Sequence, residues 1–581
     1  MDERVRRRLG LVIFLIVLFT LGLTHRLFKV QVVEGATYAA EGMQQRHPHL
    51  GVRFAEAPRG HIRERGGLLL ALDRVRYTVM ASPVFVPPEE IDTLAEQLSP
   101  IVNRPAAEIA ALLRQGETGK VLIPDATPEQ VEAIRALGSQ AVWVEESWRR
   151  VYPQRDLTAH LVGFLAFADR GDERAGFYGL EEFYDDALRP SQLHSADIEA
   201  DGSGVRPLPL EEGEFLISMP GEDLETTIDL AVQVAAMEEL ERGVQEFGAE
   251  SGLIIVMNPR TGAILALTVY PSYNPHEYFR YAGDPRLEDR LENPAVNYHY
   301  EPGSVFKIVT MGAALDSGSV TPDTTYVDPG VIECGGSPNR NWDGRSYGIQ
   351  DMRGVLIHSL NTGVVWLTCQ VIGPDVFYRY VRAFGFGRRT GVDLAGEVTG
   401  IVHYPGDLDW EDAFLGKNAY GQGIAVTPIQ MVSAVAAVAN EGKLMQPYVV
   451  ERRVRPDGAV LEHQPVVRGR PITPQTARTL TEMLVQVVEQ GVPQAQVPGY
   501  RVAGKTGTAE IPILENCYEN CYGEDTIASF VGFGPVPDPQ LVILVRLDRP
   551  QVSRWGSETA AVVFSRLAAR LFPMMGIPPG E

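Results

Sequence analysis

The sequence predicts a multidomain α/β protein. We expect an N-terminal membrane anchor, a mixed α/β module, and a C-terminal domain in which helices sandwich an antiparallel sheet. Three observations lead to this prediction. The chain has 581 residues, more than one ordinary hydrophobic core accommodates. An apolar run stands near its N-terminus. A helical pattern followed by two apolar runs around a turn marks the start of the last domain.

Residues 1–28 are expected to form a cytoplasmic tail and a transmembrane anchor. An arginine cluster, Arg4 to Arg8, precedes the apolar run Leu9–Leu23, which approaches the roughly 20 residues of a spanning helix when extended through Phe28. A cleaved signal peptide is the alternative, but the following THRLFKVQVV lacks the small residues of a cleavage site. The arginines predict a single-pass protein of the cell membrane with its N-terminus in the cytoplasm and its other domains outside.

Residues 29–221 are predicted to form a mixed α/β module. The runs Leu68–Ala71 and Tyr77–Met80 indicate short strands, and Pro88–Leu137 indicates two or three helices. The stretch Pro190–Pro220 is rich in proline, glycine, serine and acidic residues, which is typical of a linker at a domain boundary.

The C-terminal domain is predicted over residues 222–581. Asp229 can cap a helix whose apolar residues recur at steps of three and four: Leu230, Val234, Met237, Leu240, Val244 and Phe247. The runs Leu253–Met257 and Ala263–Leu267 flank an Asn-Pro-Arg-Thr-Gly turn and predict a buried β-hairpin. Further helices are expected over Pro428–Glu441 and Thr559–Phe572.

Composition and charge exclude some classes of protein. Hydrophobic residues make up 45% and charged residues 22%, ordinary values for a folded globular chain, so disorder is not expected. The net charge is -23, which repels phosphate backbones, so no nucleic acid partner is predicted.

The four cysteines suggest one disulfide. Cys517 and Cys521 lie in the segment CYENC, where a disulfide can form outside the cytoplasm. Cys334 and Cys369 are expected to be unpaired or buried. A zinc site would need two more ligands near the CYENC pair, and none is evident there, so no metal is predicted.

Ser304 is the candidate nucleophile, in the segment Glu301-Pro302-Gly303-Ser304-Val305-Phe306-Lys307. Proline and glycine break the chain just before it, and an apolar helical pattern follows, so Ser304 is expected at a helix N-terminus. Lys307 lies three residues on and so on the same face, where a neutral amine can take the hydroxyl proton. A capping serine with a solvated lysine is the alternative, because this spacing arises by chance in a chain of this size.

Two distant elements complete the candidate site. Ser359 and Asn361 stand in Ser-Leu-Asn, a pattern that alone also suits a turn. The segment Lys505-Thr506-Gly507-Thr508 places a cation, two hydroxyls and a glycine on a predicted strand edge, which suits carboxylate binding. An edge lysine that discourages aggregation is the alternative. The three elements in this order are the set found in penicillin-binding proteins and serine β-lactamases, so acyl transfer is predicted.

Over nearly its whole length the chain resembles a class B penicillin-binding protein, a monofunctional peptidoglycan D,D-transpeptidase. Boxes absent from β-lactamases carry the resemblance: Arg59-Gly60-His61-Ile62 with Arg65-Gly66-Gly67 and Leu70-Ala71, Arg150-Val151-Tyr152-Pro153 with Ala159–Gly163, Gly179-Leu180-Glu181 with Tyr184-Asp185, and Tyr420–Gly423 with Thr427-Pro428. Glu64 stands where the family usually has aspartate. The resemblance implies a dimerisation-like N-terminal pedestal, whose Arg, Gly and Glu residues are expected to hold the modules together rather than touch substrate.

The resemblance also implies a mechanism on peptidoglycan stem peptides. Ser304 would attack the carbonyl between two D-alanines, with Lys307 as base, Ser359 as proton shuttle and Asn361 as positioning group. Lys505, Thr506, Gly507 and Thr508 would bind the substrate carboxylate, and the backbone N–H groups of Ser304 and Thr508 would form the oxyanion hole. No cofactor is needed, and β-lactam antibiotics would acylate Ser304.

Other functions share this site or this architecture. A D,D-carboxypeptidase or serine β-lactamase would let water deacylate the enzyme, and a non-catalytic β-lactam sensor or division scaffold would not turn over. The intact site and the N-terminal boxes favour the transpeptidase. A membrane-embedded glycosyltransferase and other division or elongation proteins are the expected partners. The segments Ser359–Trp366 and Ile527–Phe533 favour the division type.

Overall fold

The computed structural model describes residues 57–115, 119–167, 174–194, 216–284, 286–512 and 522–579, with a few isolated positions before them. Ala57–Glu581 forms one compact unit, which is described here by itself. No helix among the described residues is long and apolar enough to span a membrane. Most of the expected anchor, residues 1–28, lies outside the described residues.

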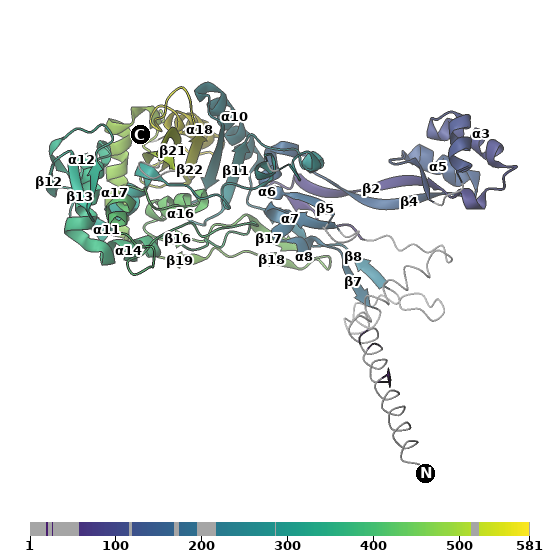
Figure 1. Cartoon of the computed structure of the whole chain (residues 1–581), viewed down its shortest axis with the longest axis horizontal. Coiled ribbons are helices and arrows are strands. Elements are labelled where there is room, and N and C mark those ends of the chain that lie inside the picture. The colour runs from purple at the N-terminus through teal and green to yellow at the C-terminus, as the bar shows by residue number, and fades with distance from the viewer. Residues whose placement is uncertain are drawn as a thin grey trace, which may run out of the picture. The chain divides into compact units, whose positions relative to one another are not determined.

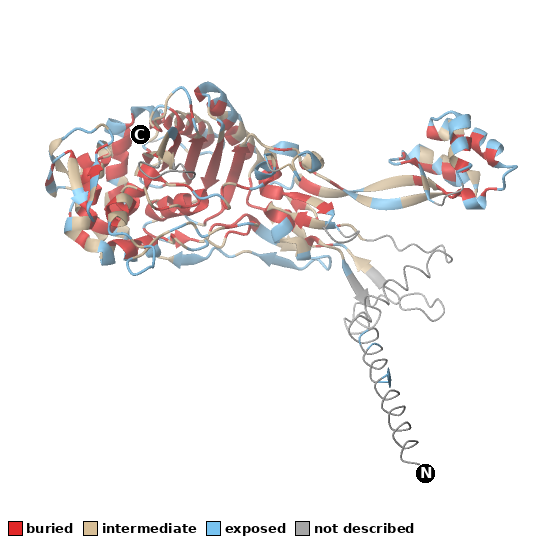
Figure 2. Cartoon of the chain, viewed as in Figure 1, coloured by how far each residue is buried: buried red, intermediate tan, exposed pale blue. Residues whose placement is uncertain are grey.

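A five-stranded antiparallel sheet is the centre of the C-terminal domain, in the order β11-β10-β22-β21-β20 (Figure 1). Its strands are β10 (Ser251–Met257), β11 (Ile264–Tyr270), β20 (Ala503–Pro512), β21 (Tyr522–Gly534) and β22 (Leu541–Asp548). The predicted hairpin is confirmed as β10 and β11, which pair with Ile254 opposite Thr268. Both strands are buried over nearly their whole length, since helices cover the sheet (Figure 2).

Helices α10 (Leu230–Phe247) and α18 (Ala560–Met574) pack against each other and against the sheet. Asp229 caps α10 by accepting hydrogen bonds from the backbone N–H groups of Ala231 and Val232, as the sequence predicted. The buried face is rotated from the predicted one: Val234 and Met237 are only half-buried. Small side chains take their place against α18 and β11, and the buried positions are Val232, Gln233, Ala235, Ala236, Leu240, Gly243, Val244 and Phe247.

The remaining helices build the other side of the domain. They are α11 (Lys307–Asp316), α12 (Met352–Ile357), α13 (Asn361–Trp366), α14 (Gly373–Ala383), α15 (Ala413–Ala419), α16 (Pro428–Ala439) and α17 (Pro474–Gln486), with a π-helical segment at Leu367–Ile372 after α13. α16 packs on β10, β21 and β22, and α17 packs on β20. The predicted helix at Pro428 is confirmed, with Thr427 and Gln430 forming a capping box.

Short strand pairs flank these helices. They are β12 (Thr325–Asp328) with β15 (Gly348–Asp351), β13 (Val331–Cys334) with β14 (Ser337–Arg340), and β16 (Leu444–Met445) with β19 (Val467–Gly469). The hairpin β13–β14 lies beside α13 and α15. It is joined to the π-helical segment by a disulfide between Cys334 and Cys369.

Cys334 and Cys369 were expected to be unpaired or buried. The disulfide shows that they are not unpaired, whereas burial is confirmed for Cys334. The two residues are separated by 35 positions, and their Cα atoms are brought to 6.3 Å by the packing of the hairpin on the helix. Sequence spacing could not reveal a pairing that depends on tertiary structure. The predicted partners Cys517 and Cys521 lie outside the described residues.

The N-terminal module contains a long two-stranded ribbon. Strand β2 (Leu69–Ala81) pairs with β4 (Val142–Val151) along most of its length, and with β3 (Lys120–Ile123) at its far end. The two short strands predicted over Leu68–Ala71 and Tyr77–Met80 are therefore one strand. Three helices pack on its far end around a separate small core, α3 (Ile91–Val102), α4 (Ala106–Leu113) and α5 (Pro128–Leu137), as predicted.

The other end of the ribbon joins a mixed sheet in the order β18-β17-β9-β1-β2-β3. Strands β1 (Ile62–Arg63) and β9 (Asp223–Thr226) pair in parallel, and β9 also pairs with β17 (Val450–Val454), which is followed by β18 (Val460–Glu462). The predicted domain boundary at residues 221–222 thus lies directly before β9, a strand that pairs with β1 from one side of the boundary and β17 from the other. The boundary remains a prediction.

Smaller elements complete the module: α6 (Ala159–Val162), β5 (Phe164–Phe167), β6 (Arg174–Phe177), α7 (Gly179–Phe183), α8 (Asp185–Leu188), β7 (Ser191–His194) and β8 (Leu216–Met219). Strands β7 and β8 pair at the two ends of the predicted linker Pro190–Pro220. The middle of that linker lies outside the described residues.

Three of the N-terminal boxes meet in a buried charge network. Glu181 is fully buried and accepts from Arg59 at 2.8 Å and from Arg150 at 2.7 Å. Arg150 also pairs with Asp73, and Arg59 with Asp185. Burial alone would raise the pKa of Glu181, but the two arginines lower it. None of these groups contacts the Ser304 elements. All five lie within residues 29–221, so the network joins parts of the N-terminal module to one another, whereas the sequence led us to expect a link between the two modules.

Candidate active site

Ser304 stands in a single 3-10 turn, Gly303–Phe306, that leads directly into α11 at Lys307. The 3-10 geometry places residues i and i+3 on one face, so Ser304 and Lys307 share a side of the turn. Gly303 has φ 56° and donates its N–H to the Gly421 carbonyl at 3.0 Å. A side chain on Gly421 would strike the Gly303 carbonyl, which explains glycine there.

The Lys307 ammonium group is fully buried and contacts the second predicted element. Its Nζ lies 2.6 Å from the Ser359 carbonyl oxygen, 3.2 Å from Ser359 Oγ and 2.7 Å from Asn361 Oδ1. Burial, together with the nearby charge of Lys505, lowers the pKa of Lys307 well below its ordinary value. The side chain is therefore suited to exist as a neutral amine, the form that a general base requires.

Ser359 and Asn361 lie at the junction of α12 and α13. Ser359 has φ 54°, the left-handed region that is costly for a residue with a side chain and is often found at functional sites. Asn361 begins α13 and donates its Nδ2 to the Arg340 carbonyl at 2.8 Å. That bond fixes the amide so that Oδ1 faces Lys307.

Lys505 brings the third element to the same place. It is 1% exposed on β20, and its Nζ donates to Ser359 Oγ at 3.0 Å. Burial lowers the pKa of Lys505 to about 7. Strand β20 is an edge strand, as predicted, so part of its backbone is free of sheet pairing. Thr506 Oγ1 lies 3.4 Å from Lys505 Nζ, and Thr508 Oγ1 accepts from the Gly556 N–H at 3.1 Å.

Gly507 also has a packing role that the sequence did not indicate. A side chain there would meet Ser529 Oγ at 2.4 Å and the Pro302 carbonyl at 2.7 Å. The glycine therefore lets β20 pack against the nucleophile turn, and its predicted role in carboxylate binding stays a prediction. The consequence is a direct contact between the segments that carry Ser304 and Thr508.

Several residues of the site were not found from the sequence. Glu301 accepts from the Gly423 N–H at 2.8 Å and from Tyr522 Oη at 3.0 Å. The rings of Trp342 and Trp555 pack edge to face, with their centroids 5.2 Å apart. Trp342 Nε1 also donates a hydrogen bond to the carbonyl of His358, the residue before Ser359. An acidic residue in the nucleophile segment was a visible signal for Glu301. Nothing in the sequence indicated the tryptophan pair.

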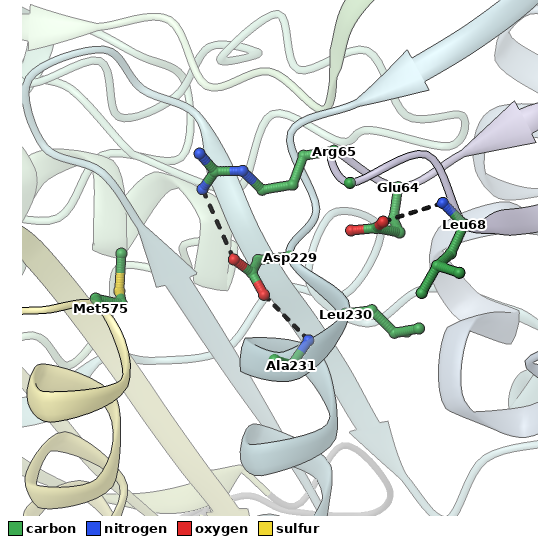
Figure 3. A pocket seen from close by; sticks show the side chains of 8 residues that line it. Glu64, Arg65, Leu68, Asp229, Leu230, Ala231 and Met575 are labelled. Carbon is green, nitrogen blue, oxygen red and sulfur yellow. Dashed lines mark hydrogen bonds and ion pairs between the residues drawn. The ribbon is translucent and has the colours of Figure 1, made fainter.

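A pocket of 570 Å³ lies elsewhere, lined by Glu64, Arg65, Gly66, Leu68, Asp229, Leu230, Ala231 and Met575 (Figure 3). Glu64, which replaces the family's usual aspartate, accepts from the Leu68 N–H at 3.1 Å and closes a turn there. Arg65 and Asp229 form an ion pair across the pocket. None of the predicted site residues lines it. Among the described residues, no cluster of His, Cys, Asp and Glu could hold a metal ion.

Comparison with known proteins matches two families in the order that the sequence predicted. The Penicillin-binding Protein dimerisation domain matches residues 54–226, and the Penicillin binding protein transpeptidase domain matches residues 252–569. The chain belongs to the penicillin-binding protein transpeptidases. It is thus a serine-type transpeptidase with the two-domain architecture of the class B penicillin-binding proteins, and D,D-transpeptidation of peptidoglycan is the activity of this group.

Individual relatives match this chain over nearly its full length. Stage V sporulation protein D of Bacillus subtilis is 31% identical over 99% of this chain and 87% of its own. The probable peptidoglycan D,D-transpeptidase PbpC of Pseudomonas aeruginosa is also 31% identical, over 100% of this chain and 97% of its own.

A solved structure agrees as well. Penicillin binding protein 3 of Mycobacterium tuberculosis, solved with aztreonam, is 27% identical with a TM-score of 0.68, covering 91% of this chain and 98% of its own. The fold expected for a penicillin-binding transpeptidase is therefore confirmed, including helices on both sides of an antiparallel sheet.

Proposed function

We propose that Ser304 is the nucleophile of a peptidoglycan D,D-transpeptidase that acts on stem peptides ending in D-Ala-D-Ala. The observation that carries this assignment is the convergence of Lys307 and Lys505 on Ser359 Oγ, at 3.2 and 3.0 Å. It joins the three sequence elements into one site whose two lysines have lowered pKa values. Clustered perturbed groups of this kind are typical of catalytic sites.

In the acylation step, Ser304 Oγ attacks the carbonyl carbon between the two D-alanines. Lys307, as a neutral amine, accepts the hydroxyl proton, and Asn361 holds the amine in place. The tetrahedral intermediate carries its negative charge on the former carbonyl oxygen, between the backbone N–H groups of Ser304 and Thr508. The contact of Gly303 with β20 keeps these two segments adjacent, since a side chain on Gly303 would lie 3.1 Å from the Thr508 carbonyl.

The C–N bond then breaks, and the terminal D-alanine leaves as an amine after it receives the proton through Ser359. Lys505, Thr506, Gly507 and Thr508 bind its carboxylate. In the second step, the amine of a neighbouring stem peptide attacks the ester, loses a proton to the same relay, and forms the cross-link as Ser304 is regenerated. β-Lactam antibiotics would follow the first step only and remain attached to Ser304.

The proposed cell location and partners rest on the apolar run Leu9–Leu23 and on membership of the penicillin-binding protein transpeptidases. We propose a single-pass membrane protein with domains at 1–28, 29–221 and 222–581 and the catalytic domain outside the membrane. It would act beside a membrane-embedded glycosyltransferase and other proteins of division or elongation, with the division type favoured by Ser359–Trp366 and Ile527–Phe533.

Labelling of the full-length protein with a fluorescent penicillin tests the nucleophile. Wild type should retain covalent label through denaturing electrophoresis, whereas Ser304→Ala should not, with the fold of both checked by thermal unfolding. Absence of label on folded wild type would contradict the assignment. Rapid loss of the label with release of hydrolysed drug would indicate a β-lactamase, and release of D-alanine without cross-links would indicate a carboxypeptidase.

A further inference from the structure

Glu301 joins three segments of the active site through one carboxylate oxygen. Its Oε1 accepts from the Gly423 N–H at 2.8 Å and from Tyr522 Oη at 3.0 Å. Glu301 itself stands three residues before Ser304, and Gly423 belongs to the turn that receives the Gly303 N–H. Tyr522 begins β21 opposite Pro512, at the far end of the hairpin whose other strand carries Lys505 to Thr508.

The spacing of these segments decides the geometry of the oxyanion hole. One of its N–H groups would come from Ser304, on the nucleophile turn, and the other from Thr508, on β20. The two segments touch at Gly303, beside the Thr508 carbonyl and the Ala509 side chain, and at Gly507, beside the Pro302 carbonyl and the Val305 side chain. These contacts bring β20 and the turn together, and hydrogen bonds that join the two would add resistance to a slide of β20 along the turn. Glu301 precedes the nucleophile turn and accepts a hydrogen bond from Tyr522 on β21, the strand paired with β20, so this bond can supply that resistance.

The surroundings of Glu301 make it an unusual group for a purely structural bond. Its Oε2 is buried and has no hydrogen-bond partner among the described residues. Four titratable groups surround it. They are Lys417 in α15, Tyr420 directly after α15, Glu510 on β20 and Tyr522 on β21. Glu510 is itself paired with Arg554, and Tyr420 donates its hydroxyl to Asn339. A neutral glutamine would accept the same two hydrogen bonds without burying a charge. A structural role alone therefore does not explain why an ionisable side chain occupies this position.

We propose that Glu301 is a positioning residue for acyl transfer, whose ionised carboxylate holds the nucleophile turn and the far end of the β20–β21 hairpin in the register that aligns the Ser304 and Thr508 N–H groups. A carboxylate accepts hydrogen bonds more strongly than a neutral carboxyl group does. Burial raises the pKa of Glu301 to about 7, more than the hydrogen bonds from Gly423 and Tyr522 and the charge of Lys417 lower it. The restraint is therefore weaker below neutral pH and stronger above it. This inference rests on the proposed role of Ser304.

The test compares Glu301→Gln with wild type across pH, as the rate of acylation of full-length protein by a fluorescent penicillin. Glutamine has the shape of the protonated carboxyl group and cannot ionise. At pH 6 the two rates should agree within about twofold, and at pH 8 wild type should be about tenfold faster. Taking the ratio cancels the titration of Lys307 and Lys505, which both proteins share. A ratio that does not change between pH 6 and pH 8 would overturn the proposal.

Tyr522→Phe provides a second variant that keeps Glu301 and removes one donor. It should slow acylation severalfold at pH 8, and its effect should be less than additive with that of Glu301→Gln, because one change removes the donor of the bond and the other weakens its acceptor. Tyr184→Phe is the matched control: it also removes a bond from a tyrosine to a buried carboxylate, Asp393, at 2.9 Å, away from the site. Its acylation rate should equal that of wild type.

The outcomes separate this inference from the assignment of Ser304. If wild type takes no label at any pH, the nucleophile assignment fails. If wild type is labelled at Ser304 and both Glu301→Gln and Tyr522→Phe react at the wild-type rate at pH 8, only the role of Glu301 fails. A fall in rate that matches a fall in folded fraction, measured by thermal unfolding, would show a structural role and overturn the proposal as well.

Discussion

Lys307 and Lys505 place their ammonium nitrogens within hydrogen-bonding distance of one oxygen, Ser359 Oγ, at 3.2 and 3.0 Å. Both side chains are buried. Burial lowers the pKa of both lysines, and the charge of Lys505 lowers the pKa of Lys307 further. These shifts support the proposed roles of Lys307 as a neutral base and of Lys505 as the group that binds the substrate carboxylate.

The burial of Lys505 predicts that its replacement will stabilise the protein. The folded-state pKa is about 7 and the ordinary value is 10.5, so between these values the unfolded chain holds a proton that the folded chain has released. Wild-type stability therefore increases as the pH rises from 7 to 10.5, and the penalty is complete below pH 7. Lys505→Met should raise the free energy of unfolding by about 2 kcal/mol at pH 7, and by less at pH 10.

Denaturant unfolding of Lys505→Met and wild type at the two pH values measures this difference. Lys443→Met, at an exposed lysine, should change stability little at either pH. The Lys505 variant should also lose acylation by penicillins, whose carboxylate it can no longer bind. A variant that is less stable than wild type at pH 7 would show that the hydrogen bonds of Lys505 outweigh its desolvation.

Asn361 offers a test of the protonation state of Lys307. Asn361→Asp replaces the amide oxygen, 2.7 Å from Lys307 Nζ, with a carboxylate. A negative charge at this distance favours the protonated lysine, so the pKa of Lys307 should rise. Acylation at pH 7 should fall about 100-fold, and the rate should recover as the pH is increased toward 9.

The neutral replacement separates charge from geometry. Asn361→Ala removes the acceptor and the bond to the Arg340 carbonyl without adding a charge. It should slow acylation without moving the pH profile to higher values. If the profiles of the aspartate and alanine variants coincide, Lys307 does not act as a neutral base.

The sequence was sufficient for the residues whose spacing is local. Ser304 and Lys307 share a turn, and Asp229 caps its helix, because three-residue spacing fixes both relationships before any tertiary contact forms. The hydrophobic periodicity predicted the wrong buried face for α10, because packing against α18 determines that face. Helix α18 lies close, so small residues such as Ala235 and Ala236 point inward. The Cys334–Cys369 pairing and the bond from Tyr522 to Glu301 join distant parts of the chain, and no local pattern records them.

The disulfide predicts a measurable loss of stability on its removal. It closes a loop of 35 residues, for which the chain-entropy estimate is about 3–4 kcal/mol. Replacing both Cys334 and Cys369 with serine should lower the free energy of unfolding by up to this amount. Reductant should destabilise wild type to the same extent. Reductant added to the double variant then reports any contribution from Cys517 and Cys521, and a double variant as stable as wild type would contradict the expectation.

Glu181 should be among the least replaceable residues outside the catalytic domain. It is fully buried and accepts from Arg59 and Arg150, both of which are also buried. Glu181→Ala leaves two guanidinium groups without their shared partner in a site that water does not reach. Breaking a buried pair in this way typically costs about 3–5 kcal/mol, because the charge left behind is not solvated. Thermal unfolding should therefore show a large fall in stability.

The same variant separates structure from catalysis. Because Glu181 contacts none of the Ser304, Ser359 or Lys505 elements, the fraction that remains folded should take up fluorescent penicillin at the wild-type rate. Asp92→Ala is the comparison, since it breaks an exposed pair with Arg114 and should change stability little. A folded Glu181→Ala protein with normal stability would show that the N-terminal boxes do not hold the module together. Slow labelling of a fully folded Glu181→Ala variant would instead show that the Arg59–Arg150–Glu181 network affects the acylation rate.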